Sequence, residues 1–446
     1  MTVFYGYITM LKKILVSIMS LLIAIPLVSC GNLNDSASYN EGEECTITLS
    51  WWGGDERHEA TKRAVELFES RHPEIHVETD CGNWDGWKTK VFSEYDNGRC
   101  ADVIQVNYDW LVNLSYNGDG FYDLEKLDKY INLSYFSEDV LRFGRRNGIL
   151  NAIPFSITGR TVFLNKEAYD SVGVPAPRTW EDLFYAAPKF NQTGIYPLEA
   201  DNGSGTTAFY IAVVYEQQKT GHQFITDNGE IGFDVDELAD ALSFYKKLQD
   251  NGVVRSVTQM ENDPSSKTLY ESDTWINGRV AGILEWGSSV AKYQKAFGNP
   301  KTLISGNLIT IPDAKSTGWM YKPSLLFAIS KDTEYPVQSA MLLDFLYNDP
   351  DCANILGTTR GIPVSSAALA VLENNGGLSG LTYDSYNSLM NSDPILISPY
   401  FENAEMQKYY RDAIEAVSLE ILTPEEAAQG IYANIIYTLG NIREGK

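Results

Sequence analysis

The chain has 446 residues, of which 44% are apolar and 21% are charged, a composition typical of a globular protein and not of a disordered or collagen-like one. This length is too great for one small core and predicts about two domains. Acidic residues outnumber basic residues by 59 to 35, so the formal net charge is −24. That charge argues against nucleic-acid partners and against a basic membrane-binding patch, because both need an excess of Lys and Arg.

The N-terminal region has the features of a secretory signal. Lys12 and Lys13 precede an apolar run over residues 14–28. The run is too short, and too interrupted by Pro26, for a good transmembrane helix. It ends in Leu-Val-Ser-Cys-Gly, which resembles a bacterial lipobox in which Cys30 is the residue that becomes lipidated after cleavage.

These features predict a lipoprotein-type signal peptide over residues 1–29 and a flexible polar tether over residues 30–44. The mature protein is then expected outside the cytoplasm, anchored to the cell membrane by the lipid on Cys30. An ordinary signal peptide with an incidental cysteine is the alternative.

The first predicted elements of the mature chain alternate between strand and helix. Short apolar and β-branched runs predict strands over residues 45–50, 75–79 and 101–106. Apolar residues at helical spacing predict helices over residues 55–72 and 84–97. This alternation predicts parallel strand pairing in an α/β sheet, and ligands bind such sheets beyond the carboxyl ends of the strands.

The middle of the chain is predicted to be mainly helical over residues 181–250, with a Gly- and Asn-rich loop at residues 201–205. A further strand is predicted over residues 278–286, and it ends at the aromatic residue Trp286.

Four cysteines remain besides Cys30. Cys45 and Cys100 each open a predicted strand, so their sulfurs could meet in a disulfide if those strands are parallel neighbours. A free buried cysteine is the alternative. The four histidines are scattered and no Cys-x-x-Cys spacing occurs, so no metal site and no cofactor are expected.

Motifs spread over nearly the whole mature chain resemble those of family 1 extracellular solute-binding proteins, the sugar-capturing lipoproteins of ABC importers. The most specific one, at residues 47–61, contains Trp-Trp-Gly-Gly-x-x-Arg-His. The others follow in the expected order at residues 68–69, 73–75, 101–105, 121–124, 153–155, 163–165, 278–281, 345–350 and 360–363. Within the family, this start and residues 84–86 and 120–124 are most similar to binding proteins for oligogalacturonides and related acidic sugars.

The resemblance implies a periplasmic-binding-protein-like α/β fold, with two α/β lobes joined by a hinge that the chain crosses three times. We place these crossings near residues 156–160, 319–324 and 360–364. The sugar is expected to bind between the lobes, which close around it by a hinge motion.

The N-terminal lobe is predicted to comprise residues 45–156 and 324–360, and the C-terminal lobe residues 157–323 and 361–446. The resemblance implies a carbohydrate ligand, ABC permease subunits in the membrane as partners, and a monomeric binding protein.

Sugar recognition requires aromatic rings against the apolar C–H faces and polar or charged groups against the hydroxyls. Core packing is the alternative for every aromatic candidate, and ordinary loop polarity is the alternative for the amides. The candidate ligand-binding residues are Trp52, Arg57, His58, Asn83, Trp84, Asn107, Tyr108, Arg160, Trp286, Trp319, Tyr321 and Arg360.

Arg57 and His58 fall in the first turn of the helix predicted to start at Asp55. Cations there oppose the helix dipole, but a helix N-terminus beside an arginine is a good site for a carboxylate. An acidic sugar would use this arrangement, whereas neighbouring acids at the surface would offset it. Arg160 and Arg360 lie at two proposed crossings, where an interlobe salt bridge is the alternative to ligand contact.

The function predicted is therefore that of an ABC-importer binding lipoprotein for a carbohydrate, most simply an oligogalacturonide or related uronide. Sialic acid, a neutral oligosaccharide and a sensing role are the alternatives. A glycosidase is the least expected, because no G-x-S-x-G, H-E-x-x-H or P-loop motif occurs and no carboxylate pair is marked out.

Overall fold

The computed structural model describes residues 42–443 except 201–204, 227, 263–267 and 298–301. These residues belong to one compact unit, Tyr39–Lys446. The predicted signal peptide, Cys30 and most of the predicted tether lie outside the described residues. Among the described helices, none combines the length and the apolar character needed to cross a membrane.

The described strands form a nine-stranded mixed sheet and a separate two-stranded ribbon, β4–β5. The main path of the sheet is β10-β6-β9-β3-β1-β2, while β11 pairs with β9, and β7 and β8 pair with β6. The strands are β1 (Cys45–Trp52), β2 (Ile75–Gly82), β3 (Val103–Val106), β4 (Arg145–Arg146), β5 (Ile149–Leu150), β6 (Ala152–Asn165), β7 (Gly282–Trp286), β8 (Leu303–Ser305), β9 (Met320–Ile329), β10 (Ile362–Pro363) and β11 (Ile395–Leu396).

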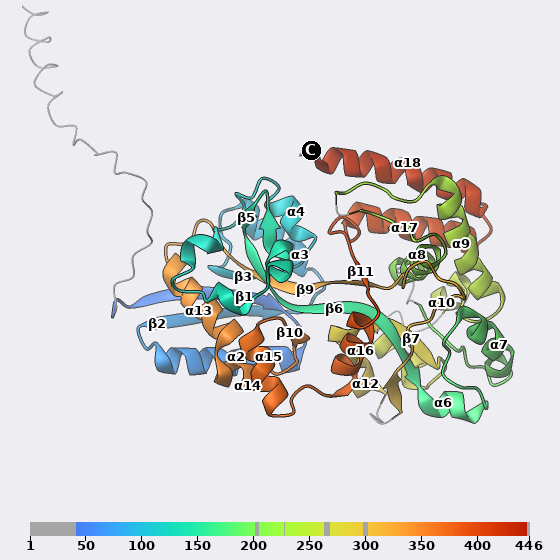
Figure 1. Cartoon of the computed structure of the whole chain (residues 1–446), viewed down its shortest axis with the longest axis horizontal. Coiled ribbons are helices and arrows are strands. Elements are labelled where there is room, and N and C mark those ends of the chain that lie inside the picture. Colours follow the sequence, from blue (N-terminus) through green and yellow to red (C-terminus); the bar gives the residue numbers. More distant parts are fainter. Residues whose placement is uncertain (1–41, 201–204, 227, 263–267, 298–301, 444–446) are drawn as a thin grey trace, which may run out of the picture. The chain divides into compact units, whose positions relative to one another are not determined.

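Helices lie between and around these strands (Figure 1). Those in the first half of the chain are α2 (Asp55–Arg71), α3 (Trp87–Asp96), α4 (Trp110–Leu114), α5 (Glu138–Leu141), α6 (Lys166–Ser171), α7 (Trp180–Asn191) and α8 (Thr206–Thr220). Those in the second half are α9 (Val235–Asp250), α10 (Val257–Glu261), α11 (Asp273–Ile276), α12 (Val290–Ala296), α13 (Pro336–Asn348), α14 (Pro350–Leu356), α15 (Ser366–Asn374), α16 (Gly380–Met390), α17 (Ala404–Ser418) and α18 (Pro424–Arg443).

The predicted alternation at the start of the mature chain is confirmed. β1 pairs in parallel with both β2 and β3. Helix α2 crosses between β1 and β2, and it buries Ala60, Ala64 and Phe68, the face that the sequence spacing predicted. The carboxyl ends of β1 and β3 consequently lie at one edge of the sheet, where a ligand site is expected.

Helix α3 begins at Trp87, three residues later than predicted. Gly86, the residue before it, has φ +77°, in the left-handed region that favours glycine. Trp84 therefore stays outside the helix in the turn after β2, and this position leaves its side chain exposed.

Although β1 and β3 are parallel neighbours, no disulfide joins Cys45 to Cys100. Cys45, Cys81, Cys100 and Cys352 are all free. Strand β3 starts only at Val103, so Cys100 precedes the ladder instead of opening it. Burial raises the pKa of the Cys100 thiol to about 11, so this group stays a protonated, unreactive thiol at neutral pH.

Strands β6 and β9 connect the two ends of the sheet (Figure 1). The first part of β6 pairs antiparallel with β9, and its last part pairs with β7 and β8. The short strand β10 pairs with β6 at Ser156 and Ile157. The three segments predicted as hinge crossings are thus hydrogen-bonded neighbours, whereas the lobe boundaries themselves stay a prediction.

The three segments predicted as hinge crossings also contact one another through side chains. The hydroxyls of Ser156 and Ser324 lie in hydrogen-bonding contact with each other, and each also lies within hydrogen-bonding distance of the carbonyl oxygen of Arg360. Since a hydroxyl has one proton, one serine can donate to the other while the second donates to the carbonyl. Strands β6 and β9 and the segment before β10 are therefore tied together by side chains as well as by the ladder.

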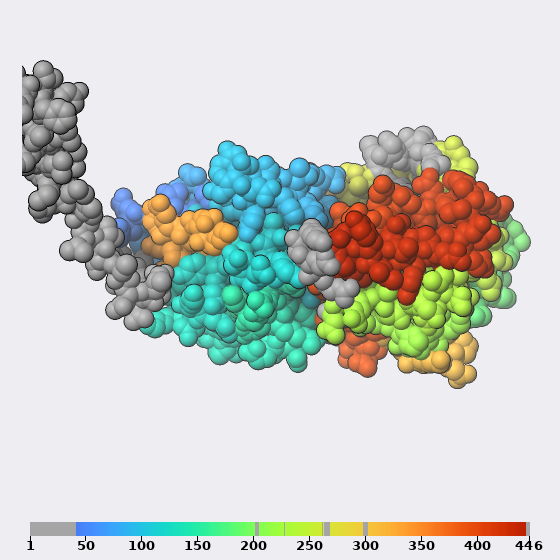
Figure 2. All heavy atoms as spheres, turned by 90° about the horizontal axis from the view of Figure 1, so that it is seen from above, coloured from blue at the N-terminus to red at the C-terminus, as the bar shows by residue number. Residues whose placement is uncertain are grey.

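A large apolar core is built from residues between Val112 and Leu439, most of them after Val162. Its helices α8, α9, α17 and α18 pack on one another, and Figure 2 shows the red α17–α18 segment beside the yellow-green segment that contains α9. Trp180 lies fully buried in this core, with its indole Nε1 donating to Gln218 Oε1 at 3.0 Å.

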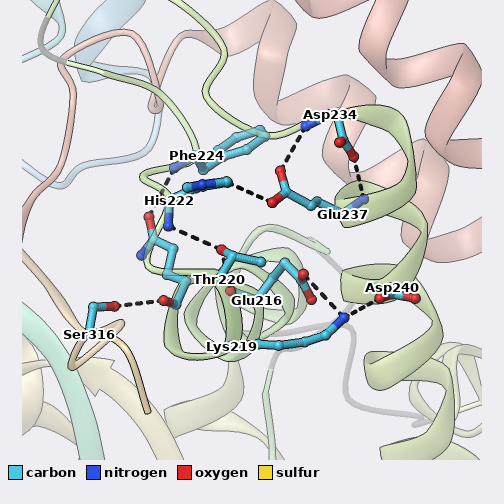
Figure 3. A network of polar contacts seen from close by, with 10 residues as sticks. Glu216, Lys219, Thr220, His222, Phe224, Asp234, Glu237, Asp240 and Ser316 are labelled. Atoms are coloured by element: carbon cyan, nitrogen blue, oxygen red, sulfur yellow. Dashed lines mark hydrogen bonds and ion pairs between the residues drawn. The ribbon is translucent and has the colours of Figure 1, made fainter.

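A polar network lies where α8 ends beside α9 (Figure 3). Lys219 contacts Glu216, with 3.4 Å between Nζ and Oε1, and it also pairs with Asp240. Nearby, His222 Nδ1 lies 2.6 Å from Oε1 of Glu237, the residue that closes the capping box of α9. Glu216 is fully buried, and its Oε2 has no hydrogen-bond partner among the residues that the structure describes. Burial raises the pKa of this carboxyl to about 7.

Replacing Glu216 by Gln should stabilise the protein at pH 8 more than at pH 5. A carboxyl whose pKa is raised in the folded state binds its proton more tightly there, so wild-type stability falls as the pH rises from about 4.5 to about 7. Gln does not ionise, so the variant should gain about 1–3 kcal/mol relative to wild type across this range. Urea unfolding at both pH values measures the difference. A difference between Glu216→Gln and wild type that is the same at pH 5 and pH 8 would contradict the prediction.

Candidate functional site

Three strands of the sheet end in aromatic or amide side chains that belong to one region. Trp52 ends β1, Asn107 directly follows β3, and Trp286 ends β7. Contacts of these residues with side chains of β6, β9 and the loop before α17 define the candidate site.

The first part of the site is an aromatic surface, which we call the tryptophan triad, formed by Trp52, Trp84 and Trp110. Ring centroids of Trp52 lie 5.2 Å from Trp84 and 5.1 Å from Trp110, and Trp84 stacks on Trp110 at 5.8 Å with 18° between the planes. Trp52 and Trp110 are buried, whereas Trp84 is 49% exposed. The triad therefore presents one indole to solvent on a rigid aromatic base.

The second part is a charged cluster formed by Lys88, Asn107, Asp109, Lys322 and Glu402. Lys88 Nζ lies 3.1 Å from Asp109 Oδ2, and Lys322 pairs with Glu402. The Asn107 side-chain amide joins the two pairs, because Nδ2 donates to Asp109 and, at 3.4 Å, to Glu402 Oε2. Burial raises the pKa of Asp109, although Lys88 opposes that shift.

The third part is Trp286, whose ring lies near two cations. The Arg160 guanidinium lies 4.7 Å from the ring centroid and Lys322 Nζ lies 4.8 Å from it. Cation–π attraction favours both placements. Arg160 NH1 also donates to Thr207 Oγ1 at 2.6 Å, so Arg160 is positioned from β7 and α8 together.

Arg57 borders the triad from the first turn of α2. Its NH1 donates to the Trp52 carbonyl oxygen and its Nε to the Thr359 carbonyl oxygen, both at 3.2 Å. Burial lowers the pKa of Arg57 to about 10, which still leaves the guanidinium charged at neutral pH. This predicted residue is thus a half-buried cation between β1 and the segment before β10.

His58 differs from the cation that the sequence analysis predicted. Trp51 is fully buried, and its Nε1 donates to His58 Nδ1 at 3.0 Å. Indole nitrogen is only a donor, so Nδ1 must be the unprotonated acceptor of a neutral imidazole. Burial also lowers the pKa of His58. His58 therefore orients Trp51 and adds no positive charge to the site.

Two further predicted residues lie away from the triad and the cluster. Arg360 is 2% exposed, donates from NH1 to Thr61 Oγ1 at 2.8 Å, and lies over the rings of Phe155 and Phe327. Trp319 is 1% exposed and donates from Nε1 to the Ile309 carbonyl oxygen at 3.0 Å. Both side chains are part of the buried interior.

The remaining predicted residues border the site. Asn83 is exposed beside Trp84 in the turn before α3. Tyr108 is buried and Tyr321 is half-buried, and both rings contact Phe143, at 6.0 and 6.3 Å between centroids. A small hollow adjoins the region, lined by Ile157, Thr158, Gly159, Gly287, Ser288, Gly361, Ile362, Thr382, Ser385 and Tyr386.

The charges of the site are unevenly balanced. Lys88 and Lys322 each have an acidic partner, as described above. Within the part of the chain that the structure describes, Arg57 and Arg160 form no ion pair with Asp or Glu, and their hydrogen bonds go to carbonyl or hydroxyl oxygens. Two uncompensated guanidinium groups in a chain of net charge −24 can receive an anion.

Sequence reasoning missed the residues that complete the charged cluster. Lys322 is the single charged residue in the otherwise apolar and polar strand β9, and that pattern could have singled it out. Glu402 lies in a loop with no comparable signal, 80 positions from its partner. Only folding brings this pair together.

Comparison with known proteins covers most of the chain. The family described as bacterial extracellular solute-binding protein matches residues 63–376. A periplasmic solute binding protein from Pectobacterium atrosepticum has 32% sequence identity and a TM-score of 0.84, with 89% of this chain and 99% of that chain covered. The expected mixed α/β fold of periplasmic solute-binding proteins is therefore confirmed.

A periplasmic oligogalacturonide binding protein from Yersinia enterocolitica, in complex with saturated digalacturonic acid, has 29% identity and a TM-score of 0.83, covering 89% of this chain and 99% of that chain. Another structure of a periplasmic oligogalacturonide binding protein from the same organism has 28% identity and a TM-score of 0.73, covering 90% of this chain and all of that one.

Proposed function

Since the chain belongs to the bacterial extracellular solute-binding protein family and is the solute-binding protein of an ABC importer, we propose that its solute is an acidic carbohydrate, of the oligogalacturonide class. The proposed site is the tryptophan triad together with Arg57, Arg160, Trp286 and the charged cluster. The sugar is bound and released without chemical change.

The observation that carries this proposal is the pair of uncompensated guanidinium groups. Arg160 uses NH1 on the Thr207 hydroxyl and has no acidic partner in the described chain. A guanidinium forms two parallel hydrogen bonds to a carboxylate, and such charge-assisted bonds are stronger than bonds to neutral hydroxyls. A uronate group therefore satisfies Arg160 better than a neutral sugar does.

The triad supports a carbohydrate as the carrier of that charge. A pyranose ring has apolar C–H faces that pack against indole, and the exposed Trp84 is held for such a contact by Trp52 and Trp110. The oligogalacturonide binding protein from Yersinia enterocolitica, similar over 89% of this chain, binds digalacturonic acid. That similarity points to the same ligand class here.

Isothermal titration calorimetry tests the proposal with the mature chain. Digalacturonate and trigalacturonate should bind, while methyl-esterified digalacturonate, maltose and raffinose should bind far more weakly. Sialic acid is the acidic competitor to include, because it carries a carboxylate on a different sugar. Equal binding of acidic and neutral sugars would contradict the proposal, and so would formation of a new product during incubation.

We further propose that the mature protein is anchored through a lipid on Cys30 and delivers its solute to ABC permease subunits. The lipobox-like sequence before Cys30 supports the anchor, and diacyl attachment is strong because more than one chain enters the bilayer. Replacing Cys30 by Ala should release the protein into the medium or periplasm, as measured by cell fractionation and immunoblotting. Retention of the variant in the membrane fraction would argue for another mode of attachment.

A further inference from the structure

The position of the Lys322–Glu402 ion pair at the candidate site indicates a role beyond stabilising the fold. Lys322, the third residue of β9, points toward Trp286, and its side chain is 6% exposed. Its acidic partner comes from the loop before α17, where the Glu402 side chain is 15% exposed. A nearly buried cation is thus neutralised by a carboxylate on a loop at the rim of the candidate site.

Glu402 also contacts the opposite part of the site. Asn107, from the end of β3, donates to Oε2 at 3.4 Å, and this is the same oxygen that pairs with Lys322. One carboxylate oxygen is therefore held by an ammonium and an amide from two different strands. These are the donors that a carboxylate of a bound uronide would need.

The position of Lys322 near Arg160 supports a role for Lys322 in binding a ligand carboxylate. Both cations lie near the ring of Trp286, but Arg160 has no acidic partner in the described chain and Lys322 has Glu402. A ligand with two carboxylates, such as a digalacturonate, presents two charges to these two cations. The ligand carboxylate that approaches Lys322 meets the Glu402 carboxylate already bound there.

We propose that Glu402 is an internal competitor that occupies Lys322 until a carboxylate of the ligand replaces it. This inference rests on the proposed function and names a residue that limits affinity within the same site. Burying an ammonium without an anion is costly, so Glu402 keeps Lys322 paired when no ligand is bound. As the ligand leaves, Glu402 pairs with Lys322 again, which favours release to the importer.

A neutral sugar does not compete with Glu402 for Lys322 as an acidic sugar does. It cannot replace the anion at Lys322, so it either leaves Glu402 in place or exposes an unpaired buried charge. Glu402 therefore lowers the affinity for acidic sugars and leaves that for neutral sugars nearly unchanged, and the two effects can be measured separately.

The test is the variant Glu402→Gln with digalacturonate and its methyl ester as probes. Glu402→Gln should strengthen digalacturonate binding by about tenfold or more, because the ligand carboxylate no longer has to displace the Glu402 carboxylate from Lys322. Affinity for the methyl ester should not rise. The control Glu425→Gln removes the same charge from an exposed position of α18 and should leave both affinities at the wild-type value.

Weaker binding of both probes by Glu402→Gln would overturn the proposal, because Glu402 would then accept ligand hydroxyls. Unchanged binding of both would also overturn it and leave a structural ion pair. The double variant Lys322→Met/Glu402→Gln carries no unpaired charge at this place and should lose the gain in digalacturonate affinity. If the double variant kept the gain in digalacturonate affinity, Lys322 would not be the cation for which Glu402 and the ligand compete.

A second measurement does not depend on the sugar. In Glu402→Gln, acetate at constant ionic strength should raise the thermal unfolding temperature more than it does in wild type, because acetate also enters the place that Glu402 has left. An equal shift in the variant and in wild type contradicts the proposal. If wild type binds acidic and neutral sugars equally, the proposed function fails, while the acetate experiment still decides the role of Glu402.

Discussion

Replacing Arg160 by Gln is expected to weaken digalacturonate binding by about 30- to 150-fold, the effect of removing charged hydrogen bonds to one carboxylate. The side chain is held in place by the ring of Trp286 and by Thr207, and it has no acidic partner in the described chain. Gln is shorter and carries no charge, but it keeps the first part of the aliphatic side chain and a polar end in this half-buried position, so the fold should not change. Calorimetry with digalacturonate measures the loss.

The specificity of this effect needs two controls. Affinity for methyl-esterified digalacturonate should fall no more than about threefold in Arg160→Gln, because a neutral ester accepts only ordinary hydrogen bonds. Arg178→Gln, which removes a positive charge from an exposed position, should bind digalacturonate as wild type does. An equal loss for the acid and the ester would assign Arg160 to the architecture of the site instead of charge recognition.

Replacing Trp319 by Ala should destabilise the protein by about 3–5 kcal/mol, the usual cost of deleting a fully buried large aromatic side chain. Trp319 is 1% exposed within the large core, and its indole satisfies the Ile309 carbonyl oxygen at 3.0 Å. The substitution creates a cavity and also leaves that acceptor without its donor. Urea unfolding of wild type and variant measures the difference in free energy.

Trp319→Phe is the matched variant, because it keeps most of the ring volume and removes the indole N–H. It should cost about 1–3 kcal/mol, the range for a lost buried hydrogen bond. Folded Trp319→Phe should bind digalacturonate with wild-type affinity. Wild-type stability combined with lost binding would instead place the side chain in the ligand site, as the sequence analysis proposed.

Local sequence patterns predicted the first part of the fold well. The run of β-branched residues in β1 and the helical spacing of Ala60, Ala64 and Phe68 depend on neighbours close in the chain, and both predictions are confirmed. The start of α3 was placed three residues too early because the left-handed backbone at Gly86 ends the preceding turn. Pattern alone does not indicate where a glycine adopts that conformation.

Residue type predicted the candidate site only in part. Trp52, Trp84, Asn107, Arg160 and Trp286 are joined by the contacts of the triad, the cluster and the Trp286 ring. An arginine or tryptophan near a strand end looks the same in sequence whether it faces a ligand or the interior. Arg360 and Trp319 illustrate this, because both side chains are buried in the interior. Trp319 donates to the Ile309 carbonyl oxygen, whereas Nε and NH2 of Arg360 have no hydrogen-bond partner among the described residues.

The charge state of a residue required the tertiary structure as well. His58 was predicted as part of a basic spot from its place in the first turn of α2. The indole of Trp51, seven positions earlier, donates to its Nδ1, and this bond selects the neutral form. Arg57, the residue directly before His58, keeps its charge because its pKa, although lowered by burial, is still about 10.

Composition and patterns between near neighbours were enough to indicate the class of this protein, an acidic mixed α/β chain with the ordered motifs of an extracellular solute-binding family. They did not indicate which charges of the site are compensated, because that depends on contacts between distant parts of the chain. Lys322 and Glu402 meet across 80 positions, while Arg160 meets no acid in the described chain. Such pairing is decided by the path of the folded backbone, because a charge interacts strongly only with groups a few ångströms away.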